Sequence, residues 1–177
     1  MGSSCSPIFS ELIMNPVDNI INRSCFKIIF YCRFVDDIFL IIEKNKVTEF
    51  MKFINNIRPF LKFTNELECE SRLPYLDVLV RRNYNSIETS IYRKPTNSYR
   101  YLNFKSHVSI QNKKAVIYSL AYRAYKLISN PHNINTGLQF IRHILYKNNY
   151  PEYLIANYLV ITVQIFCLSS NKLVYKT

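Results

Sequence analysis

Two adjacent aspartates, Asp36 and Asp37, are the residues whose type and spacing point most directly to chemistry. They stand between two apolar runs rich in β-branched and aromatic residues, 28–35 and 38–42, a pattern that predicts a β-hairpin with both carboxylates at its tip. Carboxylate oxygens on a rigid turn can hold Mg²⁺ where a phosphate group can approach it. Aspartate is also common in tight turns for backbone reasons, so the pair alone leaves a purely structural role open.

A second candidate site lies in the middle of the chain, where cationic and aromatic side chains are interleaved. Surfaces of this kind contact phosphates and stack on bases in proteins that bind nucleic acid. The alternative is that the aromatic rings are buried in a core and the cations are solvated. The residues that we expect to contact nucleic acid are Arg93, Lys94, Tyr99, Arg100, Tyr101 and Lys105.

The distribution of charge favours the same region. The chain has 177 residues and a net charge of +11, with 23 lysines and arginines against 12 acidic residues. Residues 72–126 hold 11 of the basic residues and 2 of the acidic ones, whereas residues 1–71 hold 8 and 9. A positive field of this kind suits a polyanion, either nucleic acid or an acidic membrane surface.

Composition argues against several other classes of protein. Two glycines are too few for the Gly-rich loops of P-loop or Rossmann proteins. Five cysteines without a CxxC pair or a nearby histidine cluster make a zinc site or a disulfide framework unexpected. They favour an intracellular, reducing compartment, without distinguishing nucleus from cytoplasm. The longest apolar stretches are too short to span a bilayer, so we expect no membrane partner.

The elements that would position these residues follow from periodicity. Ser6 and Pro7 predict a helix start with Ser6 as N-cap, and Pro16 should end or kink this helix. Apolar spacing predicts a second helix over residues 46–60 and helices from residue 112 onward. The strand-like runs are 62–70, 73–82 and 86–93. This order of elements predicts an α+β fold.

Four segments carry a family resemblance: GSSCSPIFSELIM, RFVDDIFLII, LPYLDVLVRR and YRKPTNSYRYLNFKSH. In this order they resemble the later half of the reverse transcriptases of Penelope-like retroelements, from polymerase motif B through motif C toward the thumb. The resemblance covers about residues 2–155. It implies a partial polymerase palm of antiparallel strands and packed helices in residues 1–94. Residues 95–158 would form a basic connector and thumb-like helices, and residues 159–177 an unassigned tail.

The resemblance also implies roles for individual residues. Asp36 and Asp37 would be catalytic ligands of Mg²⁺, and the partner would be an RNA or DNA primer-template, with no small-molecule cofactor beyond the nucleotide. The nucleotide- and template-binding positions would be Gly2, Ser3, Ser6 and Pro7, and the primer-grip-like positions Tyr75, Leu76 and Asp77.

One part of the family's catalytic site has no counterpart here. Two-metal nucleotidyl transfer needs a further aspartate, from motif A on a strand before motif B, and only Met1 precedes Gly2. The acids upstream of Asp36 are Glu11 and Asp18, which fall on or just after the first predicted helix. We therefore expect a fragment of an RNA-directed DNA polymerase that does not polymerise DNA alone but retains nucleic-acid binding.

Two alternatives remain. The chain could be a domesticated nucleic-acid-binding module. It could also be a membrane-surface protein, because Gly2 followed by Ser6 fits the myristoylation pattern and Cys5 could take a second acyl chain. Pro7 and the apolar helix behind it favour a docked N-terminus, which argues against acylation.

Overall fold

The computed structural model describes residues 5–84 and 86–172, with side chains described as far as Thr162 and at Gln164. The chain forms two compact units, Met1–Leu67 and Glu68–Thr177. The described residues form five α-helices and two small antiparallel sheets, which confirms a mixed class of helices and antiparallel strands. Residues 68–94, which the resemblance groups with the palm, lie in the second unit.

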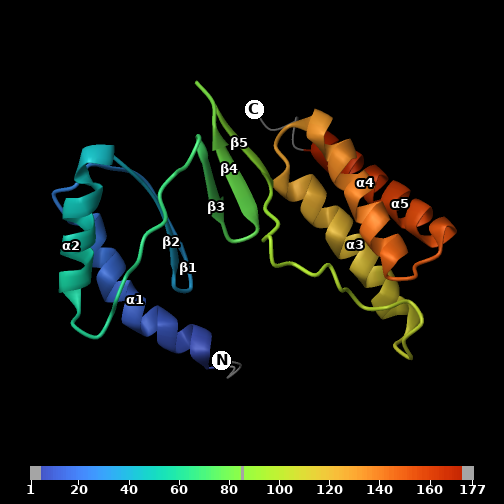
Figure 1. Ribbon diagram of the computed structural model, residues 1–177, viewed down its shortest axis with the longest axis horizontal. Coiled ribbons are helices and arrows are strands. Elements are labelled where there is room, and N and C mark those ends of the chain that lie inside the picture. The colour runs from blue at the N-terminus through green and yellow to red at the C-terminus, as the bar shows by residue number, and fades with distance from the viewer. Residues whose placement is uncertain (1–4, 85, 173–177) are drawn as a thin grey trace. The chain divides into compact units, whose positions relative to one another are not determined.

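The first unit packs two helices on one face of a β-hairpin (Figure 1). Its elements are α1 (Ser6–Asn22), β1 (Ile28–Phe34), β2 (Asp37–Ile42), the short 3-10 helix η1 (Lys44–Lys46) and α2 (Val47–Ile57). Alternate residues of β2, Ile38, Leu40 and Ile42, pack against the buried helix residues because successive side chains of a strand point to opposite faces. The core of this unit therefore lies between the helices and this face of the hairpin.

Helix α1 departs from two expectations. Cys5, not Ser6, occupies the N-cap position, and no side chain caps the helix. The helix does not end at Pro16 but continues to Asn22. An internal proline costs about 3 kcal/mol, but Val17 and Ile21 beyond it are fully buried. Burying such a side chain contributes roughly 1.5 to 3 kcal/mol, so the packing of the second half offsets the proline.

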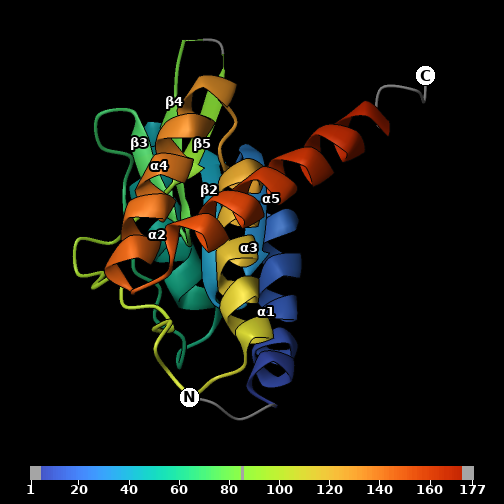
Figure 2. The ribbon, with the colours of Figure 1, turned by 90° about the vertical axis from the view of Figure 1, so that its right-hand side faces the viewer.

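The second unit combines a three-stranded antiparallel sheet with three helices (Figures 1 and 2). Its elements are β3 (Arg72–Tyr75), β4 (Val78–Arg82), β5 (Ile87–Ile91), α3 (Ile110–Leu127), α4 (Pro131–Lys147) and α5 (Glu152–Lys172). The three predicted helices are confirmed, with Ser109 and Asn130 as N-caps that accept hydrogen bonds from backbone N–H groups. The core is formed by apolar residues of all three helices, among them Ile117, Leu145 and Ile155.

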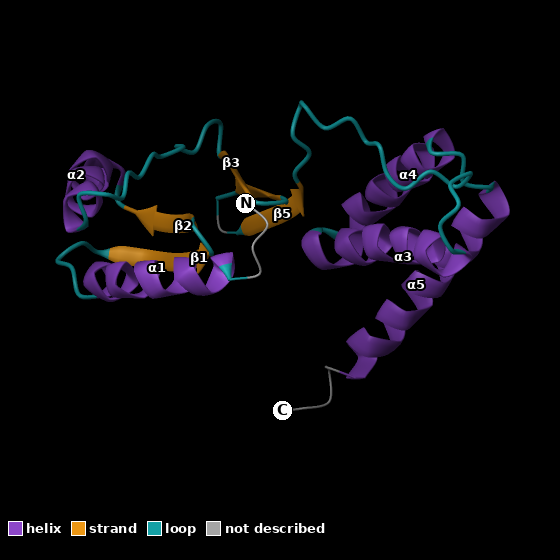
Figure 3. Cartoon of the chain, turned by 90° about the horizontal axis from the view of Figure 1, so that it is seen from below, coloured by secondary structure: helices purple, strands orange, loops and turns teal. Residues whose placement is uncertain are grey.

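The strand predictions are confirmed only in part (Figure 3). Within the described chain, residues 62–70 form no strand; Cys69 makes one isolated bridge with Arg72, and the side chain of Asn55 bonds to the backbone of Phe63. Its Nδ2 donates to the carbonyl of Phe63 at 3.1 Å, and its Oδ1 accepts from the Phe63 N–H at 2.8 Å. The run 73–82 is divided into β3 and β4 by a turn at Leu76 and Asp77, with Leu76 at φ 53°.

Candidate nucleic-acid interface

The predicted basic and aromatic segment forms the connection between β5 and α3, and part of it lies against helix α4. The guanidinium carbon of Arg93 lies 3.9 Å from the centroid of the Phe140 ring in α4. The ring of Tyr99 meets the same Phe140 ring edge-on, with centroids 5.4 Å apart. The structure therefore brings together two of the predicted residues, a cation and an aromatic ring, on one helix side chain.

A buried amide, Asn148, holds this segment at the end of α4. Its Oδ1 accepts from the Tyr101 N–H at 3.0 Å, and its Nδ2 donates to the carbonyl of Tyr99 at 3.0 Å. The backbone carbonyl of Asn148 also accepts from the Phe104 N–H at 3.0 Å. The sequence analysis missed this residue, since nothing in the sequence distinguishes its side chain from that of the neighbouring Asn149.

The cations of the segment differ in exposure from Lys113, which follows it in α3. Lys94, Arg100 and Lys105 are exposed, and no described residue forms an ion pair with any of them. Lys113, in contrast, is buried and donates from Nζ to the carbonyl of Ser106 at 2.7 Å. The ring of Tyr99 packs on helix α4, as in the structural alternative, while three of the predicted cations remain available to a polyanion.

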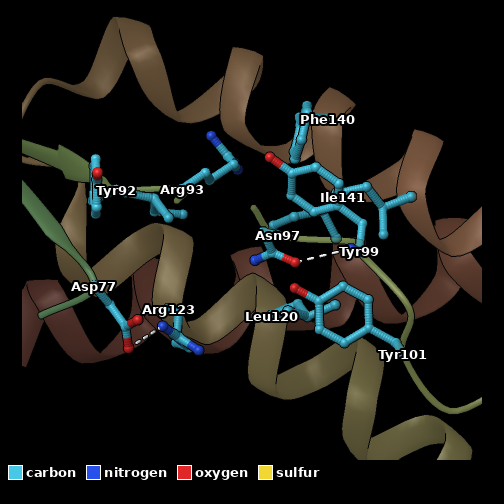
Figure 4. Close-up of a pocket in the computed structure, with 12 residues that line it drawn as sticks. Asp77, Tyr92, Arg93, Asn97, Tyr99, Tyr101, Leu120, Arg123, Phe140 and Ile141 are labelled. Atoms are coloured by element: carbon cyan, nitrogen blue, oxygen red, sulfur yellow. Dashed lines mark hydrogen bonds and ion pairs between the residues drawn. The ribbon is translucent and has the colours of Figure 1, made fainter. Parts of the chain in front are cut away.

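A small hollow lies between the segment and the helices, as Figure 4 shows. Its volume is about 100 Å³, well below the roughly 300 to 1,000 Å³ of sites that hold drug-sized ligands. Asp77, from the turn between β3 and β4, forms an ion pair here with Arg123 of α3. Of the primer-grip-like residues, Tyr75 ends β3, Leu76 forms the turn, and Asp77 lines the hollow.

Helix α4 carries a second feature that the sequence analysis missed. Its buried side contains Ile141, Ile144 and Leu145. Another side of the helix carries exposed side chains that can form hydrogen bonds. These residues recur every three or four positions, so they share one face. They are His132, Asn135, Thr136, Gln139, Arg142 and His143. The signal was present in the sequence as polar residues between the apolar positions that predicted the helix.

The β1–β2 hairpin places the aspartate pair one residue away from the expected position. Val35 and Asp36 form the turn, and Asp37 opens β2 opposite Phe34. The predicted hairpin is confirmed, and both aspartates are exposed. Val35 has a φ of 57°, which is unfavourable for a β-branched residue.

The two upstream acids are bound to an arginine. Arg33 of β1 donates from Nε to Asp18 Oδ2 at 2.9 Å and from Nη2 to Glu11 Oε2 at 3.0 Å. Its side chain is only 8% exposed. Tyr31 O–H donates to the other Asp18 oxygen at 2.5 Å. Because Glu11 and Asp18 bind Arg33, their carboxylates are not positioned beside those of Asp36 and Asp37 as further metal ligands.

The carboxylates that the hairpin exposes are those of Asp36 and Asp37. Among the residues that the structure describes, no group of three His, Cys, Asp or Glu side chains lies close enough to hold a metal ion. Two carboxylates can bind one Mg²⁺ together with phosphate oxygens. Of the residues predicted to bind template and nucleotide, Gly2 and Ser3 lie outside the described residues, and Ser6 and Pro7 begin helix α1.

Comparison with known proteins points to the second unit. Residues 100–159 match a family model described as an animal helix-turn-helix domain. The match covers about a third of the chain and takes in α3, α4 and the start of α5. Neither the curated proteins nor the solved structures include a match to the chain. Within the described residues, no helix has the length and apolar character needed to cross a membrane.

Proposed function

We propose that this chain binds duplex nucleic acid through its second unit, with helix α4 lying in the groove. The observation that carries the proposal is that the helix-turn-helix match falls on three packed helices, one of which presents an exposed polar face. In helix-turn-helix proteins the second helix of the pair lies in the major groove. Helix α4 is the second helix of the α3–α4 pair, joined to α3 by residues 128–130.

The side chains on the exposed face of α4 have the chemistry of base recognition. Asparagine and glutamine form paired hydrogen bonds with adenine, and arginine does so with guanine. Asn135, Gln139 and Arg142 provide these groups. Arg142 pairs with Glu152 at 2.5 Å, but both side chains are about half exposed. Such surface pairs contribute about 0 to 1 kcal/mol, so Arg142 can exchange this partner for a base.

The exposed cations beside α4 would contact the phosphate backbone. Lys94, Arg100 and Lys105 belong to the segment that Asn148 and Phe140 hold against the helix. Phosphate contacts of this kind position a protein on the duplex and make binding dependent on salt, but they do not select a sequence. The second unit thus combines a helix for base contacts with cations for positioning.

The test is binding of the full chain to a fluorescently labelled duplex, measured by anisotropy over a series of salt concentrations. We expect the triple variant Lys94→Ala, Arg100→Ala, Lys105→Ala to reduce the slope of log affinity against log salt by roughly two to three. The matched control, Lys27→Ala, Lys52→Ala, Lys62→Ala, removes the same charge from exposed lysines of the first unit and should leave the slope nearly unchanged. Wild-type binding that ignores salt, or equal losses in both variants, would contradict the proposal.

A second candidate function, that of a reverse-transcriptase fragment, rests on the first unit. Its support is the β1–β2 hairpin, which exposes Asp36 and Asp37 next to the strained Val35. In this proposal, the two aspartates hold one Mg²⁺, which would supply charge neutralisation to a phosphate group.

Two measurements test this second candidate. Millimolar Mg²⁺ should shift the amide resonances of Asp36 and Asp37 in NMR spectra, and Asp36→Asn should abolish the shift. The purified chain should not extend a primer, because the described residues provide no third carboxylate beside the pair. If Mg²⁺ causes no shift of these resonances, the proposed metal site is wrong. If the purified chain extends a primer and Asp36→Ala abolishes the extension, the expectation of an inactive fragment is wrong.

A further inference from the structure

The hollow beside α4 supports a more specific assignment, which rests on the proposed function. We propose that it is a phosphate-binding subsite, in which Arg93 pairs with one phosphoryl group of the bound nucleic acid. The phosphoryl group can be a 5′-terminal phosphate or a phosphate within the backbone, since the two present the same tetrahedral anion. The balance of charge, the position of Arg93 and the size of the hollow each support the assignment.

The hollow contains one positive charge without a counter-ion. Arg93, Arg123 and Asp77 line it. Asp77 forms its ion pair with Arg123, and no described residue forms an ion pair with Arg93. The uncompensated charge of the hollow is therefore that of the Arg93 guanidinium.

Arg93 is also partly buried, which makes an anionic partner more favourable than it would be for a fully exposed arginine. Burial lowers the pKa of the Arg93 guanidinium, although arginine remains charged in proteins. The group stacks on the Phe140 ring at 3.9 Å. Stacking covers a face of the guanidinium plane, while its N–H donors lie in that plane and remain suited to a phosphate. Hydrogen bonds in which both partners are charged are about twice as strong as neutral ones.

The hollow is large enough for a phosphoryl group. A volume of about 100 Å³ exceeds the roughly 10 to 15 Å³ that one water molecule needs, which leaves room for a small anion. The remaining lining includes Tyr92, Tyr99 and Tyr101, whose hydroxyl groups can donate to phosphate oxygens, and the amide of Asn97 (Figure 4). A phosphoryl group in this position would replace the water and supply the missing negative charge.

The first experiment titrates the full chain with inorganic phosphate and follows the ¹⁵N resonances of Asn97, Tyr99 and the Arg93 side chain. Chloride at equal ionic strength serves as the background. We expect saturable shifts in the wild type and in the control variant Arg81→Ala, which removes the charge of an exposed arginine of β4. The shifts should be lost in Arg93→Ala and weakened in Arg93→Lys, which keeps the charge but not the planar group of donors. Absence of saturable shifts in the wild type, or unchanged shifts in Arg93→Ala, overturns the proposal.

The second experiment compares duplexes with and without 5′-phosphates. Arg93→Ala should weaken binding to the phosphorylated duplex about tenfold at low salt and lower the salt slope by about one. If removing the 5′-phosphate weakens wild-type binding equally, the ligand is the terminal phosphate; if it has no effect, the ligand is a backbone phosphate. Arg93→Lys and the thermal unfolding of each variant control for loss of packing on Phe140.

The proposed function and the subsite fail in different ways. If Arg93→Ala binds duplex as tightly as the wild type does, the proposed subsite is wrong and nucleic-acid binding by the chain still stands. A wild-type chain that shows phosphate shifts but no duplex binding would overturn the proposed function and leave an anion site in the hollow.

Discussion

Two hairpin turns of this chain, β1–β2 and β3–β4, share a geometry but differ in their surroundings. The β1–β2 turn consists of Val35 and Asp36, and the β3–β4 turn of Leu76 and Asp77. In each the first residue is apolar with a positive φ, 57° and 53° respectively, and the second is an aspartate. Asp77 pairs with Arg123, whereas no described residue pairs with Asp36. An aspartate at this position is thus a property of the turn, and its surroundings decide whether it can act on a ligand.

An arginine supports each turn, but in a different environment. Arg33 is almost fully buried and donates to the Val35 carbonyl at 2.7 Å as well as to two acids of α1. Arg123 reaches Asp77 from α3 with 45% of its side chain exposed. Because burial removes the competition from water, we expect the first hairpin to depend on its arginine far more than the second.

The largest expected effect is the loss of Arg33. Arg33→Ala leaves Asp18 without its cation in a largely buried position and should lower the free energy of unfolding by roughly 2 to 4 kcal/mol. Arg123→Ala breaks an exposed pair and should cost at most about 1 kcal/mol. Urea unfolding gives the total effect, and hydrogen exchange of the β1 and β2 amides shows where it falls. Equal losses for the two variants would contradict this difference between the turns.

Alkaline pH should act on the same network with a smaller effect. Burial, followed by the hydrogen bond to Asp18, raises the pKa of the Tyr31 hydroxyl above its ordinary value of about 10. Above pH ~10 the unfolded chain therefore loses this proton while the folded chain keeps it, so stability falls as pH rises, by up to about 1.4 kcal/mol per pH unit.

Tyr31→Phe should remove this part of the pH dependence, measured by urea unfolding between pH 9 and 11. Tyr84→Phe is the matched control because Tyr84 is fully exposed. If Tyr31→Phe loses stability with pH as steeply as the wild type, Tyr31 does not retain its proton in the fold.

The smallest expected effect comes from relieving the two positive φ angles. Glycine adopts this conformation without steric cost. Both Val35→Gly and Leu76→Gly should therefore raise the free energy of unfolding, measured with urea, by about 0.5 to 1 kcal/mol. Val35→Gly should gain more, since its β-branched side chain is the more strained at this φ. A larger gain for Leu76→Gly than for Val35→Gly would contradict this order. It would mean that the side chain of Val35, which is 36% exposed, contributes more to packing than its exposure indicates.

The parts of the fold that the sequence predicted are those that depend on local spacing. The hairpin around Asp36 and the helices α3, α4 and α5 follow from apolar periodicity. The failures involve contacts that periodicity does not show. The backbone of Phe63 bonds to the amide of Asn55 and not to a strand, and packing beyond Pro16 extends a helix that proline alone would end.

The candidate site shows the same division. The types of Arg93 and Tyr99 predicted a surface that contacts nucleic acid, but their meeting on Phe140 depends on a contact over more than forty residues of chain. Lys113 shows the limit of counting charges, because its ammonium group is directed to the carbonyl of Ser106 and is not available at the surface. Charge and residue type therefore predicted the region, whereas the individual contacts required the fold.

The buried amide of Asn148 has a consequence for affinity. Through its side chain and its carbonyl, this one residue fixes the backbone at Tyr99, Tyr101 and Phe104. A flexible segment would lose conformational entropy when a ligand binds, at roughly 1 to 2 kcal/mol for each residue that becomes ordered. Here that loss is incurred during folding, so the segment is preorganised and more of the interaction energy with a ligand is retained as affinity.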